Sequence, residues 1–328
     1  MQNLVKILPN GAVLIGENFT VDGHYERPFR IVTHFHSDHT IGLEKSIITC
    51  NGVIATPLTL EILSIDYPIP PRKTFGLNYD IKMTFEDESI ILKKSDHVMG
   101  SAQVLVKLRN GLEVGYTGDF KNPEKGTPIL HPDILIMEAT YGKPEFRRPF
   151  KNDIESLFAD YVKDALIYGP VRIYGYHGKL QEVMVSLRKM GIDAPFITSG
   201  KISKMTKIAI KHGYNITQVF DETEAEAKEI MRDSWYIIFS HYNEFKRRNG
   251  NYFNFLLSGW EFRDIVRKLD SKSYIVSFSD HADFDDLIYY ASTTSAKYII
   301  TDGGRKSYAK ELADYISRKL GKVAISMP

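Results

Sequence analysis

Between residues 12 and 137, hydrophobic residues occur in short runs that polar or turn-forming residues interrupt. Runs of four to five residues, rich in Val and Ile and bounded by Gly, Asn, Asp or Pro, predict strands. They cover residues 12–16, 29–33, 89–92, 102–106, 112–116 and 134–137. The last run is apolar throughout, which is typical of a strand buried on both faces. Pro57 opens a predicted helix that extends to Leu63, with proline in its first turn.

The pattern changes after Gly142. A Pro- and Arg-containing linker, Lys143 to Pro149, precedes segments in which the helical and strand periodicities alternate. Helices are predicted at 153–167, 180–190 and 222–231, and strands at 171–176 and 235–239. Such alternation indicates a parallel α/β layer. After about residue 270 the pattern returns to strand–loop–helix units, at 274–278, 284–291 and 297–300.

Composition indicates a globular protein, and its single cysteine is compatible with a reducing compartment. Of the 328 residues, 43% are hydrophobic and 25% are charged, as in ordinary globular domains. A single cysteine, Cys50, excludes an internal disulfide and a cysteine-based metal cage. The opening residues lack a signal-peptide pattern, and no apolar run approaches the roughly 20 residues of a membrane span. We therefore expect a cytoplasmic protein that does not contact a membrane.

Charge is unevenly distributed, although the formal net charge is only +1. Residues 143–272 contain 22 Lys and Arg against 17 Asp and Glu, so this middle segment is basic and the remainder is acidic. A basic segment that faces a metal site would suit a polyanion. An ordinary solvated surface explains the same distribution equally well.

The most informative segment is His34-Phe35-His36-Ser37-Asp38-His39, with the pattern H-x-H-x-D-H. It contains three imidazoles and one carboxylate within six residues, and both groups are preferred zinc ligands. His34 and His36 point to the same side if the chain is extended there. Asp38 and His39 can then address a second ion. Burying four such groups without partners would cost several kcal/mol, so a structural explanation is poor.

This segment resembles the signature of the metallo-β-lactamase superfamily, and later segments resemble its further motifs in order. Ser95-Asp96-His97 is similar to the next histidine motif, and Thr117-Gly118-Asp119-Phe120 to the following one. The resemblance implies that His34, His36 and His97 hold a first ion and that Asp38 and His39 hold a second. Asp119 would bridge them. Two ions roughly 3.5–4 Å apart can clamp an in-line displacement.

Other motifs resemble the β-CASP nuclease branch. Glu138, which directly follows the run 134–137, and His281, in Ser279-Asp280-His281-Ala282-Asp283, match its extra motifs. The basic α/β segment between them matches its inserted cap. The resemblance implies an α/β fold, a metallo-β-lactamase αββα sandwich with an inserted α/β β-CASP cap domain. We expect sandwich parts at 1–145 and 269–328 and the cap at 146–268. Several sequence segments most closely resemble those of the small prokaryotic DNA-ligase-associated exonuclease-like proteins.

The third β-CASP motif departs from its usual pattern. Asp302 stands where that motif has His or Val. Asp302 can be a ligand of the second ion, or a turn residue in Asp302-Gly303-Gly304. The expected cofactors are two divalent ions, Zn²⁺ or alternatively Mn²⁺.

The expected activity is hydrolysis of single-stranded nucleic acid, exonucleolytic on DNA, leaving a 5′-phosphate. Asp38, Glu138 and His281 are the expected catalytic residues, with Glu138 orienting His281 as a proton or hydrogen-bond donor. Lys179, Ser101 and Ser279, together with Arg147 and Arg148, are the expected substrate-binding residues. His177, beside Lys179, is a weaker candidate for the same role.

Alternative functions remain open. An RNA-processing endonuclease or 5′-exoribonuclease of the same branch would have the same motifs. A small-molecule ester or thioester metallohydrolase would share the six-residue signature but not the Glu138/His281 pair. A non-catalytic scaffold would be metal-free. DNA-repair proteins such as a ligase or helicase are the expected protein partners.

Overall fold

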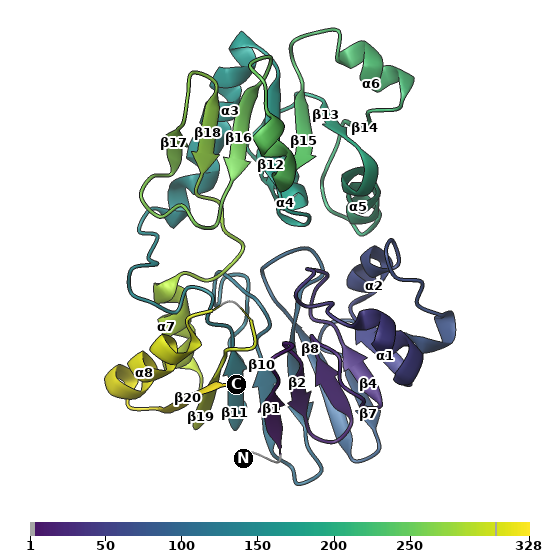
Figure 1. The fold of residues 1–328 in the computed structure, drawn as a ribbon, viewed down its shortest axis with the longest axis vertical. Coiled ribbons are helices and arrows are strands. Elements are labelled where there is room, and N and C mark those ends of the chain that lie inside the picture. The colour runs from purple at the N-terminus through teal and green to yellow at the C-terminus, as the bar shows by residue number, and fades with distance from the viewer. Residues whose placement is uncertain (1–3, 306) are drawn as a thin grey trace. The chain divides into compact units, whose positions relative to one another are not determined.

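The computed structural model describes residues 4–305 and 307–328. Contacts divide the chain into two units (Figure 1): unit 1 comprises residues 1–147 and 281–328, and unit 2 comprises residues 148–280. The expected cap began at residue 146 and ended at residue 268, so the second boundary differs. Strand β18 (Ser273–Val276) belongs to unit 2 because it pairs with β16 (Phe253–Leu257) and β17 (Val266–Lys268).

Unit 1 contains two sheets. The six-stranded sheet has the order β1-β2-β3-β4-β5-β6. Its strands are β1 (Val5–Ile7), β2 (Val13–Ile15), β3 (Phe19–Val21), β4 (Phe29–Ile31), β5 (Gly52–Ala55) and β6 (Thr74–Gly76). The seven-stranded sheet has the order β20-β19-β11-β10-β9-β8-β7. Its strands are β7 (Lys82–Phe85), β8 (Glu88–Lys94), β9 (Ala102–Lys107), β10 (Glu113–Tyr116), β11 (Ile134–Met137), β19 (Tyr298–Asp302) and β20 (Val323–Met327).

The inner faces of these sheets form one hydrophobic core, to which both sheets contribute fully buried side chains such as Phe19, Ile31, Val104 and Ile136. Burial of so much apolar surface is the main source of stability for such a sandwich. Helices α1 (Leu43–Thr49) and α2 (Pro57–Leu63) pack on the outer face of the six-stranded sheet.

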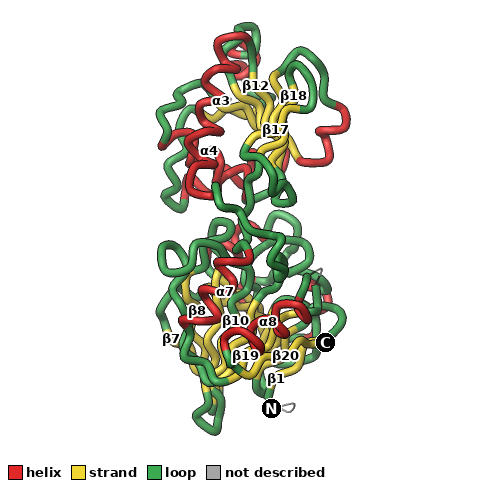
Figure 2. The backbone as a smooth tube through the Cα atoms, turned by 90° about the vertical axis from the view of Figure 1, so that its left-hand side faces the viewer, coloured by secondary structure: helices red, strands yellow, loops and turns green. Residues whose placement is uncertain are grey.

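The outer face of the seven-stranded sheet is covered by α7 (Phe284–Thr293) and α8 (Ala309–Leu320), as Figure 2 shows. The layers are therefore helix, sheet, sheet, helix. This arrangement confirms the expected αββα sandwich. The sequence analysis located α2 but assigned no helix to the segments that form α1 and α8.

Unit 2 is built on a mostly parallel sheet with the order β14-β13-β15-β12-β16-β18-β17. Its other strands are β12 (Val171–Gly175), β13 (Phe196–Thr198), β14 (Val219–Asp221) and β15 (Ile237–His241). Its helices are α3 (Ile154–Tyr168), α4 (Lys179–Lys189), α5 (Gly200–Lys211) and α6 (Ala225–Ile230), and η2 (Lys151–Asp153) and η3 (Tyr242–Arg247) are 3-10 turns. A further such turn, η1 (Pro71–Lys73), lies in unit 1. The expected parallel α/β layer is thus present.

Helices cover both faces of the unit 2 sheet. Phe158 of α3 packs on Phe255, and Arg188 of α4 lies over Phe196, so α3 and α4 cover one face (Figure 2). Helix α6 packs on the opposite face, with Ala227 against Ile197 and Ile238. Among the described residues, no helix combines the length and apolarity needed to cross a bilayer.

Candidate metal centre

The loop that follows β4 carries the first set of candidate ligands. Arg30, a fully buried residue of β4, holds the backbone of this loop in place. The Arg30 guanidinium donates to the carbonyl oxygen of His39 at 2.9 Å and to that of Ile41 at 3.4 Å. This anchoring fixes the loop in a turn that points several imidazoles the same way.

Four side chains from three loops converge beside this turn. One ligand atom from each of His34, His36, His97 and Asp119 lies within 4.8 Å of those of the other three. His97 comes from the loop between β8 and β9, and Asp119 follows β10. The Asp119 Oδ2 atom lies 3.6 Å from Nε2 of His34 and 3.7 Å from Nε2 of His97. Nδ1 of His36 lies 3.2 Å from Nε2 of His97.

The chemistry of this cluster fits a divalent cation. Nε2 of His34 and Nε2 of His39 are buried and have no hydrogen-bond partner among the described residues. Buried polar atoms without partners are rare because each costs free energy. Burial, followed by the neighbouring imidazoles of His39, His97 and His36, holds the pKa of His34 well below its usual range. Neutral imidazole is the form that binds metal, so a cation would satisfy both nitrogen atoms.

Asp22, which the sequence reasoning missed, fixes the orientation of His39. Its fully buried carboxylate accepts hydrogen bonds from Thr33 N at 2.8 Å and from Thr33 Oγ1 at 2.5 Å. Oδ2 of Asp22 also lies 2.8 Å from Nδ1 of His39. With the Nδ1 proton held by Asp22, His39 could give Nε2 to a cation that displaces the Nε2 proton, as histidines with an outer carboxylate do in many metal sites. In the sequence, Asp22-Gly23 indicates only a turn.

Asp38 and His39, the expected ligands of a second ion, complete no three-ligand group among the described residues. Nε2 of His39 is 3.1 Å from Asp119 Oδ2 and 3.5 Å from Asp38 Oδ2. The Asp38 side chain is 55% exposed and is therefore free to move onto a cation. Burial and the charge of Arg305 lower the pKa of His39, but Asp119, Asp38 and Asp22 outweigh them and raise it to about 10.

Glu138 and His281 form a hydrogen-bonded pair next to Asp119. Oε2 of Glu138 lies 3.1 Å from Nδ1 of His281, and Oε1 accepts from Phe120 N at 2.7 Å. Nδ1 of His281 is 3.9 Å from Asp119 Oδ2. Burial raises the pKa of Glu138, against the lowering effect of His281. The structure thus brings together the two residues, 143 positions apart, that the sequence assigned to one catalytic pair.

Asp302 forms an ion pair with Arg305. Its Oδ2 atom accepts from Arg305 Nη1 at 2.7 Å and from the Tyr116 hydroxyl at 3.2 Å, while Oδ1 accepts from Gly304 N at 2.8 Å. Asp302 belongs to none of the possible metal-holding groups among residues 4–305 and 307–328. This arrangement favours the turn interpretation over ligation, because a metal would have to compete with Arg305.

The expected substrate-binding residues have structural partners. Nζ of Lys179 lies 3.0 Å from Asp280 in an ion pair that is about 95% buried. Ser101 closes a turn by accepting from Val98 N at 3.1 Å. Arg147 pairs with Asp285 at 2.7 Å, and the buried Arg148 donates to Gly259 O. Ser279 is half-buried in the loop after β18.

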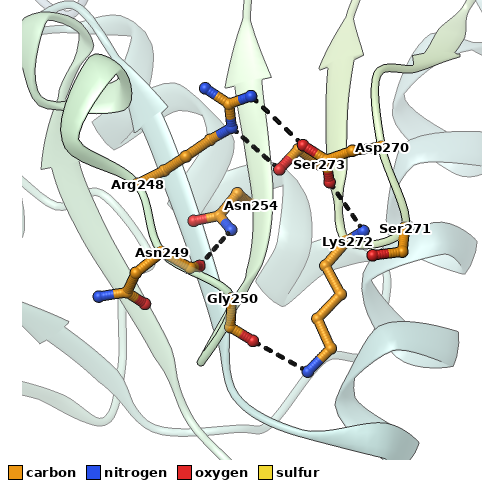
Figure 3. Close-up of a pocket in the computed structure, with 8 residues that line it drawn as sticks. All are labelled: Arg248, Asn249, Gly250, Asn254, Asp270, Ser271, Lys272 and Ser273. Carbon is orange, nitrogen blue, oxygen red and sulfur yellow. Dashed lines mark hydrogen bonds and ion pairs between the residues drawn. The ribbon is translucent and has the colours of Figure 1, made fainter.

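A separate cavity of about 390 Å³ lies in unit 2, at the amino ends of β16 and β18 (Figure 3). Its polar side chains bind one another: Arg248 donates to Ser273 and Asp270, and Lys272 donates to Gly250 O. In parallel α/β sheets, ligands bind at the carboxyl ends of the strands, and this cavity lies at the other end. We therefore assign no chemistry to this cavity.

The chain is similar to several known proteins. A family model described as "Zn-dependent metallo-hydrolase RNA specificity domain" matches residues 267–328. An "Uncharacterized protein in lig 3'region" of Acidianus ambivalens is 62% identical over 138 residues, which cover 42% of this chain and 99% of that protein. A "Probable RNase MJ4" of Methanocaldococcus jannaschii is 30% identical over 157 residues. These cover 45% of this chain and 36% of that protein.

Two further similarities are longer and weaker. A "Probable DNA ligase" of Opitutus terrae is 24% identical over 310 residues, or 91% of this chain, but the match covers only 29% of that protein. This chain thus spans about a third of the RNase and of the ligase. A solved structure of a protein from Enterococcus faecalis, covering 85% of this chain and 76% of that one, has a TM-score of 0.55 at 13% identity, which shows the fold alone.

The sandwich and its histidine–carboxylate cluster define a metal-binding hydrolase. The chain belongs to the β-CASP branch of the metallo-β-lactamase superfamily, which confirms the expected family.

Proposed function

We propose that the protein is a di-metal phosphodiesterase that hydrolyses single-stranded nucleic acid. The observation that carries this proposal is the convergence of His34, His36, His97 and Asp119, beside which the Glu138–His281 pair stands. Relatives named as an RNase and as a DNA ligase support a nucleic-acid substrate. The basic composition of unit 2 is compatible with a polyanion.

The distances support two ligand sets. His34, His36, His97 and Asp119 would hold the first ion. His39, Asp38 and Asp119 would hold the second, for which Asp302 remains a weaker candidate because of Arg305. Bound Zn²⁺ or Mn²⁺ would polarise a phosphoryl oxygen and lower the pKa of water.

The remaining chemistry falls to the Glu138–His281 pair. Glu138 holds Nδ1 of His281, which directs Nε2 of the same ring away from the carboxylate. A proton on Nε2 can be donated to the departing 3′-oxygen, or can form a hydrogen bond to a phosphate oxygen as charge develops there. Departure of the 3′-oxygen leaves a 5′-phosphate on the downstream product.

We favour exonucleolytic action on DNA in association with a DNA ligase. The Acidianus relative is named for a lig 3′ region, and the Opitutus relative is named as a DNA ligase over a match that spans most of this chain. RNA cleavage is a specific second candidate, because the matching family model is described as an RNA specificity domain and another relative is named as an RNase.

The test is digestion of 5′- and 3′-end-labelled single strands of DNA and RNA by protein loaded with zinc or manganese. Stepwise shortening of DNA that EDTA abolishes supports the proposal, and internal cuts in RNA support the second candidate. Hydrolysis of a thioester but of no strand would overturn both. Elemental analysis that finds no metal after zinc loading would instead indicate a scaffold.

A further inference from the structure

Two neighbouring parallel strands of unit 2 end side by side. Gly175, the last residue of β12, is in register with His241, the last residue of β15. The chain then leaves β12 into α4 and leaves β15 into η3. Helix α4 lies on the Phe196 side of the sheet, whereas Phe245 of η3 packs with Tyr174 on the opposite side. When the connections that follow two neighbouring parallel strands leave toward opposite faces of the sheet, a crevice forms between the strand ends. Parallel α/β sheets bind ligands in such crevices.

Aromatic rings fill this position. The rings of Tyr176 and Tyr242 are stacked, with centroids 4.7 Å apart and planes at 9°. The rings of His177 and His241 lie beside them, with centroids 4.9 Å apart. We call these four residues the stacking platform. Tyr176 is 46% exposed, although exposing an aromatic ring to water is unfavourable.

The platform already contains one stacked pair of rings. One face of Tyr176 is covered by Tyr242, and His241 meets Tyr176 edge-on, with planes at 82°. Gly178, with φ of +88°, turns the chain immediately after His177 so that the ring-bearing loop stays at the strand end. A planar partner can extend such a stack at little conformational cost, because the rings already hold one another in place.

A basic helix begins next to the platform. Helix α5 follows β13, which pairs with β15. Its twelve residues include Lys201, Lys204, Lys207 and Lys211 and no acidic residue. Lys204 is exposed. Lys201 is near enough to His241 to help lower the pKa of that imidazole, although burial is the larger cause.

We propose that the stacking platform binds a nucleobase of single-stranded nucleic acid, and that Lys201 and Lys204 bind the adjoining phosphates. The combination is the one that proteins use for single strands, in which aromatic faces take bases of any sequence and cations follow the backbone. This inference rests on the proposed nuclease function for its choice of ligand. It assigns to unit 2 a binding site distinct from the residues that would hold metal.

The test compares an intact strand with an abasic strand of the same length. EDTA is present, so that binding is measured without cleavage. In anisotropy titrations, Tyr176→Ala should weaken binding of the base-bearing strand roughly 5- to 100-fold and leave the abasic strand unaffected. Tyr176→Trp should restore binding and show emission that the strand quenches. Lys201→Gln with Lys204→Gln should weaken both strands and reduce the salt dependence.

The matched control is Tyr161→Ala. Tyr161 lies in the same unit, is 42% exposed and also contacts a tyrosine, Tyr274, at 5.9 Å. DNA and RNA strands should respond alike to Tyr176→Ala, because stacking does not involve the sugar. Equal loss for intact and abasic strands, or equal effects of the Tyr161 and Tyr176 substitutions, would overturn the platform.

The result is separable from the proposed activity. Hydrolysis of labelled strands without base-dependent binding at Tyr176 would remove the platform and leave the nuclease. Base-dependent binding at Tyr176 without hydrolysis of any strand would remove the nuclease and leave the platform. Thermal unfolding of Tyr176→Ala that matches the wild type shows that lost binding is not lost folding.

Discussion

Replacing Asp22 with asparagine tests whether this buried carboxylate orients His39 for metal. Asp22 is fully buried and accepts three hydrogen bonds, two from Thr33 and one from His39. Asparagine retains one oxygen acceptor but places an amide donor where the other oxygen was. Oδ2 accepts from both Thr33 Oγ1 and His39 Nδ1, so an amide nitrogen in its place removes the acceptor of both, and the charge-assisted hydrogen bond to His39 alone is worth roughly 1.5–3 kcal/mol.

The expected loss of zinc affinity is about 10- to 100-fold, the range for removing an outer carboxylate from a metal-binding histidine. The assay is competition for zinc between the protein and a chromophoric chelator, with zinc content checked by elemental analysis. Because Nδ1 of His39 would then have no acceptor to fix its tautomer, Nε2 would offer its lone pair to the metal for only part of the time.

Asp80→Asn is the matched control. Asp80 also adopts a positive φ, 65° against 46° for Asp22, so both substitutions meet the same backbone requirement. Its side chain is 67% exposed and pairs with Lys93 on the surface. Zinc affinity should therefore be unchanged in Asp80→Asn. Wild-type affinity in Asp22→Asn would refute the reasoning, because His39 would then not depend on Asp22.

Three further predictions follow from other contacts. His281→Ala should lower turnover far more than zinc content, measured on the same sample; parallel losses would remove His281 from catalysis. Arg305→Met should lower the free energy of unfolding by about 3–5 kcal/mol, since it leaves Asp302 buried without its cation, and adding Asp302→Asn should recover most of it. Hydrogen bonds from Ser203 and Thr223 lower the pKa of Asp221 from 3.8 to about 2. These hydrogen bonds stabilise the folded protein above pH 3.8, and their contribution is lost as the pH falls through 2. The difference in free energy of unfolding between the wild type and Asp221→Asn should therefore disappear in acid.

The sequence by itself determined the fold class, and it predicted the four residues that the structure brings together in the candidate metal centre. The six candidate ligands, four in H-x-H-x-D-H together with His97 and Asp119, are chemically distinctive, since few structural roles require buried imidazoles beside carboxylates. Short apolar runs bounded by turn residues located most strands of the sandwich, because alternation and burial leave a local signal. The helix Pro57–Leu63 was located at its correct ends because proline in the first turn marks its start.

Only the tertiary structure decided which polar residues meet. Asp22 in sequence is a turn residue, yet long-range packing of β3 against β4 places it under His39. Lys179 and Asp302 were assigned to substrate and metal, but Asp280 and Arg305 lie against them. The stacking of Tyr176 on Tyr242 likewise depends on the pairing of β12 with β15. Partners distant in sequence carry no periodicity of their own, so hydrophobic patterns cannot reveal them.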